Sequence, residues 1–237
     1  MRLLLGLALS SLLFLQGCSS TSQLSPAGDA VYYALSSDAT LRTWVDACKT
    51  GDSRTAQDAI VARQDWWNRN GALVEGADFG LAYGMIYISE DRAETGARLA
   101  LAMTWNIIEN AEKEVNERLK NANLDRTCQA EFARYMKGDF DLKNSKQHHR
   151  ELITLQGVKQ RSSEDLKMKQ ASVELHTGKE FGRSLFVVEK IAKRNGCPGA
   201  DVKLLKNEWP NEIYGVSCPD QSYMLTQCEW GNCRILK

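Results

Sequence analysis

Proline is scarce in this chain, and its placement leaves a long internal stretch without helix breaks. The sequence has four prolines in 237 residues, and none lies between Pro26 and Pro198. Proline inside a helix removes a hydrogen bond and clashes with the preceding turn. The stretch between these prolines is therefore free to form helices, and we expect a helical domain over residues 29–196.

Familiar catalytic signatures are also missing. The sequence contains no nucleophile elbow, no glycine-rich phosphate loop and no His-Glu-x-x-His zinc motif. Of its three histidines, His148 and His149 are adjacent and would point about 100° apart on a helix, so they cannot chelate one ion together. His176 stands alone. We interpret all three as surface residues and expect no cofactor and no metal ion.

Long apolar runs are limited to one, at the start of the chain. Leu3 to Phe14 is almost unbroken but is shorter than the span of about 20 residues that a transmembrane helix needs. Arg2 precedes it, and a charged start before a short apolar core is the layout of a secretory signal. No second run reaches spanning length, so we expect the rest of the protein to be soluble.

The residues that follow this run resemble the lipobox of bacterial lipoproteins: Leu15-Gln16-Gly17-Cys18 has an aliphatic residue, a tolerant position, a small residue and a cysteine. The resemblance implies that residues 1–17 are a signal peptide, that Cys18 carries a diacylglycerol, and that its new amino group is acylated, for example with palmitate. Ser19, where Asp tends to retain such proteins in the inner membrane, implies the periplasmic face of the outer membrane. A plain signal peptide or an uncleaved anchor is the alternative. The polar residues 18–28 are predicted to form a flexible tether.

The other six cysteines form an even set. In an exported chain this predicts three disulfides, because the periplasm is oxidising. Four of the six lie in the last 41 residues, which leaves Cys48 and Cys128 for each other. Zinc bound by four thiolates is the alternative, and no Cys-x-x-Cys pair is present to suggest a redox role.

Capping and breaking residues divide the helical domain. We expect one helix from an Asp38 N-cap to Cys48, and a second that starts at Asp52 or Ser53 and stops at Asn70-Gly71. A later helix contains Cys128, with Phe132 and Tyr135 on a nearby face, and ends at Gly138. Another, amphipathic, runs from Phe181 to Asn195-Gly196.

Small residues recur every four positions at Ala72, Gly76, Gly80 and Gly84, which places them on one face of a helix. Glycine costs a helix about 1 kcal/mol relative to alanine, so the repeat indicates close approach of another backbone. Gly96, Ala100 and Thr104 have the same spacing. We therefore predict a close-packed helical hairpin over residues 71–120, with its turn at Ser89 to Asp91 and the two small-residue stripes facing each other.

The last part of the chain switches pattern. Short aromatic and branched runs at 212–218, 223–228 and 233–236 are separated by Pro219-Asp220 and Trp230-Gly231-Asn232. Turn residues between short runs predict an antiparallel β-meander. We expect residues 197–237 to form a small disulfide-bonded β-module, with Cys228 facing Cys233 across the last turn and Cys197 left for Cys218. The predicted fold class is α+β, mainly helical.

Charge is distributed unevenly although the net charge is zero. Residues 18–136 contain 12 basic and 17 acidic residues, whereas residues 137–206 contain 15 basic and 9 acidic residues. Either the two parts face one another, or the basic part contacts lipid phosphates or an acidic partner. Within it, residues 140–176 are so polar that they predict either a long solvated helix or a partly disordered segment.

Two groups of residues are candidates for function. Glu75 and Asp78 lie three residues apart near tryptophans, an arrangement found in glycan-cleaving sites, although the helix dipole also favours acids in a first turn. Trp67, Trp209 and Trp230 lie near predicted helix ends or turns, where aromatic anchors can bind a partner.

We expect a non-enzymatic lipoprotein, attached to the membrane by lipid, that binds an envelope protein in the periplasm. The alternative is a peptidoglycan-directed enzyme or binder that uses Glu75 and Asp78. Nucleic acid is not an expected partner outside the cytoplasm.

Overall fold

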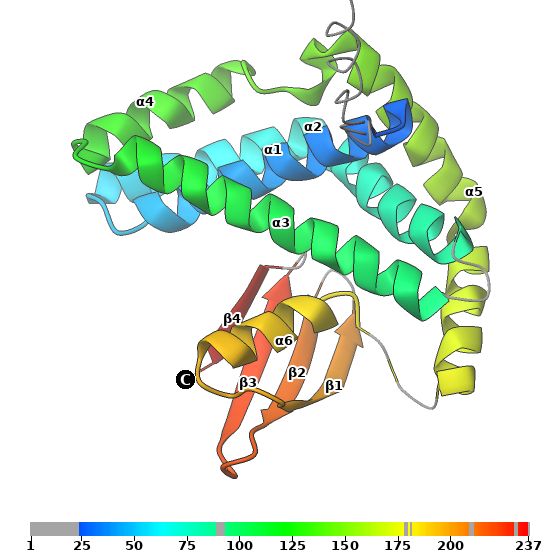
Figure 1. The fold of residues 1–237 in the computed structure, drawn as a ribbon. Helices are drawn as coiled ribbons and strands as arrows, with labels where there is room; N and C mark the ends of the chain where they lie inside the picture. Colours follow the sequence, from blue (N-terminus) through cyan, green and yellow to red (C-terminus); the bar gives the residue numbers. More distant parts are fainter. Residues whose placement is uncertain are drawn as a thin grey trace, which may run out of the picture.

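The protein is α+β, as the sequence predicts. A computed structural model describes residues 24–88, 93–177, 180, 182–208, 211–229 and 232–236. Within these residues six α-helices precede a four-stranded antiparallel sheet (Figure 1). Among the described helices, none combines the length and the apolar character needed to cross a bilayer.

Helix α1 (Pro26–Cys48) begins earlier than the sequence suggested. Ser25 caps it by accepting a hydrogen bond from the Gly28 amide at 3.1 Å, and Pro26 occupies a first-turn position that suits its fixed φ. Residues 26–28, which were expected in the tether, are therefore the first turn of this helix. Asp38 is not an N-cap, because it lies in the middle of α1 and is buried there.

Helix α2 (Ser53–Ile88) begins where predicted, with the Asp52 carboxylate accepting from the Thr55 amide at 2.7 Å. The predicted stop at Asn70-Gly71 is wrong, because α2 continues for almost five more turns. The Asn70 side chain is buried and serves another element: it accepts from the Leu142 amide at 2.8 Å and donates to the Trp66 carbonyl at 2.9 Å.

The glycine stripe of α2 faces helix α5 (Lys146–Thr177) and not α3 (Ala93–Leu119). A Cβ on Gly76 would lie 2.9 Å from the Gln156 backbone, and one on Gly80 would lie 2.7 Å from the Leu155 side chain. Helices α2 and α3 do contact each other, but the predicted partner of the stripe is wrong. The expected turn at residues 89–91 lies outside the described residues. The surroundings of Gly96 and Ala100, which were expected to face Gly84 and Gly80, are not described either.

The polar segment 140–176 is helical for most of its length. Helix α4 (Leu124–Lys137) ends as predicted at Gly138, which has a left-handed φ of 84°. A short 3-10 turn (Leu142–Asn144) follows, and α5 then packs against α1 and α2 through buried residues such as Leu152. Of the two alternatives for this segment, the structure therefore has the long helix, over Lys146–Thr177.

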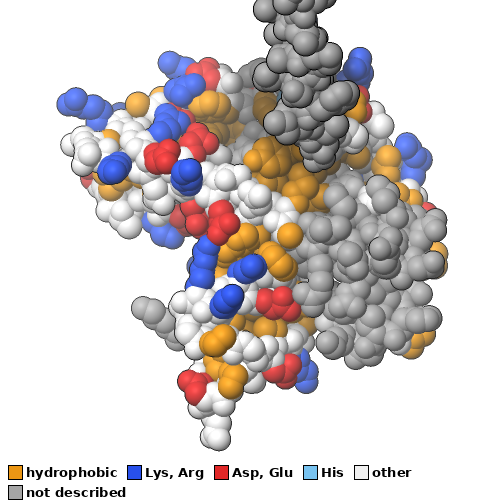
Figure 2. Space-filling model, viewed as in Figure 1, with side chains coloured by type: hydrophobic (Ala, Val, Ile, Leu, Met, Phe, Trp, Pro, Cys, Tyr) orange, Lys and Arg blue, Asp and Glu red, His pale blue; other side chains and the backbone are white. Residues whose placement is uncertain are grey.

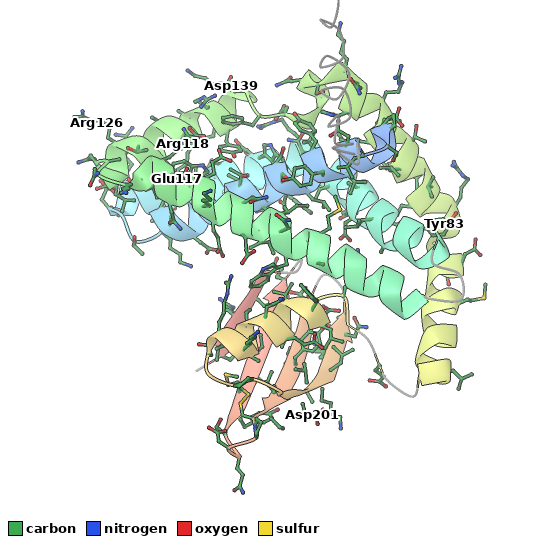
Figure 3. The ribbon with its side chains drawn as sticks, viewed as in Figure 1. Tyr83, Glu117, Arg118, Arg126, Asp139 and Asp201 are labelled. Atoms are coloured by element: carbon green, nitrogen blue, oxygen red, sulfur yellow. A yellow bond between two sulfur atoms is a disulfide. The ribbon has the colours of Figure 1, made fainter. Side chains whose placement is uncertain are left out.

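The helical body has one large core. Its largest fully buried side chains are Trp44, Trp66 and Phe132, contributed by α1, α2 and α4. The Trp66 indole donates to the Phe140 carbonyl at 3.0 Å, so its polar group is satisfied inside the core. Arg118 near the end of α3 (labelled in Figure 3) binds both carboxylate oxygens of Glu131 on α4, at 2.8 and 2.7 Å.

The second unit consists of α6 (Leu185–Arg194) and strands β1 (Asp201–Glu208), β2 (Asn211–Ser217), β3 (Tyr223–Glu229) and β4 (Asn232–Leu236). The strands pair in sequence order, as a meander does, and β1 is an additional strand that the sequence pattern did not reveal. Val188 and Ala192 of α6 share a core with Tyr214 and Val216 of β2. Helix α6 therefore belongs with the sheet, and a boundary at residue 196 divides this unit.

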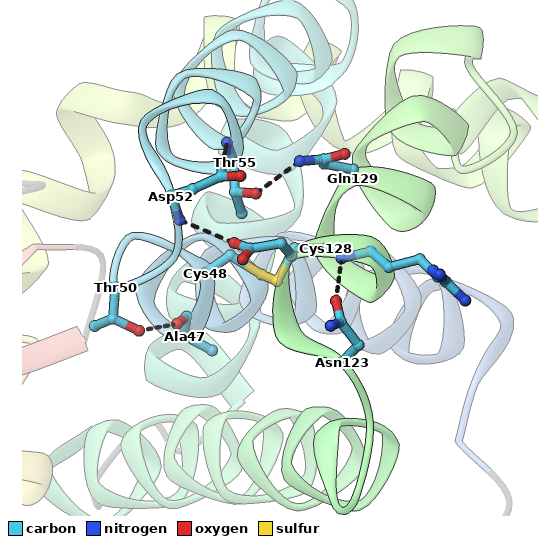
Figure 4. Close-up of a disulfide and its surroundings, with 10 residues drawn as sticks. Ala47, Cys48, Thr50, Asp52, Thr55, Asn123, Cys128 and Gln129 are labelled. Carbon is cyan, nitrogen blue, oxygen red and sulfur yellow. Dashed lines mark hydrogen bonds between the residues drawn. A yellow bond between two sulfur atoms is a disulfide. The ribbon is translucent and has the colours of Figure 1, made fainter.

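The three disulfides join the pairs favoured by the sequence: Cys48–Cys128, Cys197–Cys218 and Cys228–Cys233. Figure 4 shows the first, which connects the end of α1 to α4 in a buried position. Beside it Gln129 donates to the Thr55 hydroxyl at 3.0 Å, so α4 is also bound to the start of α2. The other two disulfides hold the sheet unit.

Candidate binding groove

A groove runs along the seam between the helical body and the sheet unit. Helix α3 passes over α6 in Figure 1, and the two helices contact each other. Two adjoining hollows lie there and share Trp105 of α3 and Arg194 of α6. We define this groove by nine residues that line one or both hollows: Trp105, Ile108, Glu109, Phe186, Lys190, Ile191, Lys193, Arg194 and Ile235.

The amphipathic pattern of α6 explains which side chains reach the groove. Val187, Val188 and Ala192 are buried, and the latter two pack on the sheet. This packing turns the helix face that carries Lys190 and Arg194 away from the sheet core and toward α3. Figure 2 shows charged side chains of both signs gathered where α3 passes over this unit.

One hollow is bordered by aromatic rings with cations above them. The Arg194 guanidinium lies 4.4 Å from the Trp105 ring centroid and also pairs with the Glu109 carboxylate. The Lys190 ammonium lies 5.1 Å from the centroid of Phe186. Cation–π contacts at exposed sites contribute about 0.5–1 kcal/mol each, so they favour these positions of the charges beside the rings.

The adjoining hollow is more apolar. Ile108, Ile191 and Ile235 line it, and it ends at Cys233 of the Cys228–Cys233 disulfide. Aliphatic side chains beside a fixed aromatic–cation pair can bury an apolar side chain of a ligand.

Charged, aromatic and aliphatic side chains line the groove. Among the described lining residues, the ionisable side chains are Glu109, Glu112, Lys190, Lys193 and Arg194, and Cys233 is held in a disulfide. Among the described residues no cluster of His, Cys, Asp and Glu could hold a metal ion. Lys190 and Lys193 are exposed on its border and have no ion-pair partner in the described part of the chain. The groove therefore presents two available cations next to aromatic and aliphatic surface.

The carboxylates proposed for glycan cleavage have other partners. Asp78 is bound by both terminal nitrogens of the Arg183 guanidinium, at 2.6 and 2.7 Å, and Glu75 pairs with Lys159 of α5. The first pair links α2 to the segment that leads into α6, and the second links α2 to α5. Each carboxylate is therefore held by a cation from another part of the chain.

The tryptophans proposed as partner anchors are only partly covered by the structure. Trp67 is half-buried and lies under the Arg63 guanidinium, 4.7 Å from its ring centroid, so it packs within the helical body. Trp209 and Trp230 lie outside the described residues, as does Cys18.

His148, interpreted as a surface residue, is partly exposed but has specific partners in the fold. Its side chain is 21% exposed, and its ring stacks on Tyr33 with centroids 4.4 Å apart. Its two nitrogens lie 2.9 Å from the Ser145 hydroxyl and 2.9 Å from the Asp29 carboxylate. Ser145 also begins α5, since its carbonyl accepts the His149 amide at 2.8 Å, so this arrangement joins the first turns of α1 and α5.

Sequence reasoning did not find the groove. Trp105 and Ile108 belong to an apolar stripe that predicts a core-facing side of the helix, and Ile108 is indeed half-buried. The available signal was the cluster Lys190, Lys193 and Arg194 on an amphipathic helix, but its partner helix is about 85 residues away along the chain. No protein-family model matches the chain, and neither a curated protein nor a solved structure matches it.

Proposed function

We propose that the protein is an exported lipoprotein, attached to the membrane through Cys18, that binds an envelope protein through the groove between α3 and α6. The observation that carries the proposal is the pair of exposed lysines, Lys190 and Lys193, that lie beside the Trp105–Arg194 stack and have no ion-pair partner among the described residues. Aromatic and arginine side chains supply most of the binding energy at protein interfaces.

The disulfides support export. Three disulfide bonds account for all six cysteines of the chain other than Cys18. Disulfides form in oxidising compartments such as the periplasm and are rare in the cytoplasm. Free-thiol titration of the denatured, unreduced protein is expected to find no thiol. A Cys18→Ser variant is expected to lose palmitate labelling and membrane retention.

The groove also indicates the chemistry of the partner. Lys190 and Lys193 favour acidic side chains, and the apolar hollow lined by Ile108, Ile191 and Ile235 favours an aliphatic or aromatic one. A partner segment with an apolar residue next to one or two acidic residues satisfies both. Charge complementarity of this kind contributes mainly to specificity and to the rate of association.

Site-specific photocrosslinking in intact cells tests the proposal. A photoreactive residue at Asn106, Lys193 or Asn195 lies in or beside the groove, whereas one at Ile60 or Ile153 lies at an exposed position that does not line it. We expect a reproducible adduct with an envelope protein at the groove positions only.

A charge-reversal variant provides the matched control. Lys190→Glu with Lys193→Glu is expected to abolish the adduct formed at Asn195, whereas Lys203→Glu with Lys206→Glu makes the same change of charge on β1 and should leave it intact. Adducts at Ile60 or Ile153 but at none of the groove positions would contradict the groove as the docking site. Crosslinks to glycan fragments instead of protein would favour the peptidoglycan alternative.

A further inference from the structure

We propose that the end of the molecule where α1 and α5 begin faces the membrane, and that Lys143, Lys146 and Arg150 there bind the phosphates of anionic phospholipids. The orientation rests on the proposed lipid attachment at Cys18, whereas the chemistry rests on the described surface. The ligand is the headgroup layer of the membrane to which the protein is attached.

The length of the chain before α1 limits how far this end can move from the lipid. Residues 19–25 are the seven residues between Cys18 and the first helical residue, Pro26. A chain spans at most 3.3–3.6 Å per residue, so this segment reaches about 25 Å when fully extended. The start of α1 therefore stays close to the membrane surface.

The start of α5 shares this end of the molecule with the start of α1. The His148 imidazole, in the first turn of α5, contacts the Asp29 carboxylate in the first turn of α1 at 2.9 Å. The same ring stacks on Tyr33, one turn further along α1. Because Lys146 and Arg150 flank His148 in the chain, they are held at this end.

The cations at this end are exposed and weakly paired. The side chains of Lys143 and Arg150 are 66% and 78% exposed. Lys143 lies 3.8 Å from Asp141, which already receives two hydrogen bonds from Arg69, and Arg150 lies 3.7 Å from Glu151.

Lys146 is also exposed and has no ion-pair partner among the residues described. Exposed pairs contribute little energy, so all three charges are available to an anionic surface. A negatively charged leaflet attracts basic side chains within about one Debye length, about 8 Å at physiological salt.

Vesicle co-sedimentation of the unlipidated protein tests the proposal independently of anchoring. The mature chain with Cys18→Ser, exported behind a conventional signal peptide, is mixed with vesicles of phosphatidylglycerol and phosphatidylcholine or of phosphatidylcholine alone. We expect binding to the anionic vesicles only, and weaker binding as salt is added. Lys143→Glu with Lys146→Glu and Arg150→Glu is expected to lower the partition coefficient by at least about tenfold.

A second triple variant is the matched control. Lys203→Glu with Lys206→Glu and Arg234→Glu makes the same change of charge on the sheet, where all three residues are exposed, and should bind like the parent protein. Circular dichroism and melting temperature establish that both variants are folded.

The proposal is overturned if the parent fails to bind anionic vesicles at low salt, or if both triple variants lose binding equally. It is also overturned if inorganic phosphate at constant ionic strength displaces the protein, because the site then recognises a free anion. Failure of Cys18 lipidation shows separately, as absence of palmitate labelling.

Discussion

Gly76 and Gly84 lie about two turns apart on α2 and have different surroundings. A Cβ on Gly76 would meet the Gln156 backbone at 2.9 Å, whereas one on Gly84 would have no atom within 4 Å. We expect Gly76→Ala to lower the free energy of unfolding by about 2 kcal/mol, because the α5 backbone must move. Urea unfolding followed by circular dichroism measures the change.

Gly84→Ala is the control for helix propensity. It is expected to be neutral or to stabilise the protein by up to about 1 kcal/mol, because alanine is the better helix former and space is available. Gly80→Ala should fall between the two, since its close neighbour is the flexible end of Leu155. Equal effects of Gly76→Ala and Gly84→Ala would contradict the close contact of α2 with α5.

Two buried tyrosines predict loss of stability at alkaline pH. Burial, with nearby carboxylates, raises the pKa of Tyr135 and of Tyr214 well above the usual value. Their contribution is fully present below the unfolded pKa of about 10, and it is lost as pH rises above that value because only the unfolded chain then releases these protons. Each tyrosine should lower the free energy of unfolding by about 1 kcal/mol between pH 10 and 11, and by about 1.4 kcal/mol for each further pH unit while the folded tyrosine stays neutral.

Urea unfolding at a series of alkaline pH values, with absorbance at 295 nm to follow tyrosinate, measures this slope. Tyr214→Phe is expected to reduce the slope by the share of one tyrosine. Tyr223→Phe, at a residue that is 58% exposed, should leave it unchanged. A parent protein whose stability is flat above pH 10 would be inconsistent with two tyrosines buried in the neutral form.

Single polar residues limited what the sequence could predict. Asp38 and Asn70 have the residue types of a helix start and a helix stop, yet both are buried inside helices. Asp38 binds Arg42 at 2.7 Å and Arg63 at 3.1 Å, and Asn70 binds the backbone of Leu142. Capping rules assume that the polar group serves its own backbone, so they fail when its partner lies elsewhere in the fold.

At the scale of elements, prediction succeeded where turn residues and periodicity agreed. The end of α4 at Gly138 and the meander of β2, β3 and β4 follow from local patterns, and they were predicted. Strand β1 was missed because its only buried residue is Leu204, so the alternation that identifies a strand is absent. The groove was missed because it depends on how α3 and α6 pack, which local patterns do not specify.

The disulfides of the two units are expected to contribute differently to the free energy of unfolding. Cys48–Cys128 closes a loop with a sequence separation of 80, whereas Cys228–Cys233 closes one with a separation of 5. Loop-closure entropy gives about 4.5 kcal/mol for the first and about 2 kcal/mol for the second. Replacing Cys48 and Cys128 by serine should therefore lower the free energy of unfolding more than replacing Cys228 and Cys233.

Thermal unfolding of both double variants, without reductant, compares the two bonds. The fully buried position of Cys48 and Cys128 adds a packing loss in the first variant and so acts in the same direction. If the variant without Cys228–Cys233 lost more stability, the entropy of the unfolded chain would not be what decides which disulfide stabilises the protein more.

At the scale of the whole molecule, arginines hold the sheet unit against the helical body. The Arg42 guanidinium donates to the Glu229 carbonyl at 3.0 Å, Arg183 binds Asp78, and Arg194 pairs with Glu109. The Arg183 amide also donates to Glu212, a fully buried carboxylate of β2, at 2.6 Å. Arg183 therefore connects α2 to the sheet through both its side chain and its backbone.

Removing the Arg183 side chain should loosen the seam while leaving the helical core intact. Arg183→Ala leaves the backbone bond to Glu212 in place but removes two hydrogen bonds from the Asp78 carboxylate, which is 12% exposed, at a cost of about 1–3 kcal/mol. We expect faster amide hydrogen exchange in β1 to β4 and unchanged exchange in the cores of α1 and α2, measured by mass spectrometry. Arg234→Ala on β4, where the arginine donates to the Gln227 side chain within the sheet at 3.0 Å, is the matched control and should change neither. Because the groove is built from both units, Arg183→Ala should also weaken the groove adduct in cells. Faster exchange throughout the helices would instead show that the two units unfold as one.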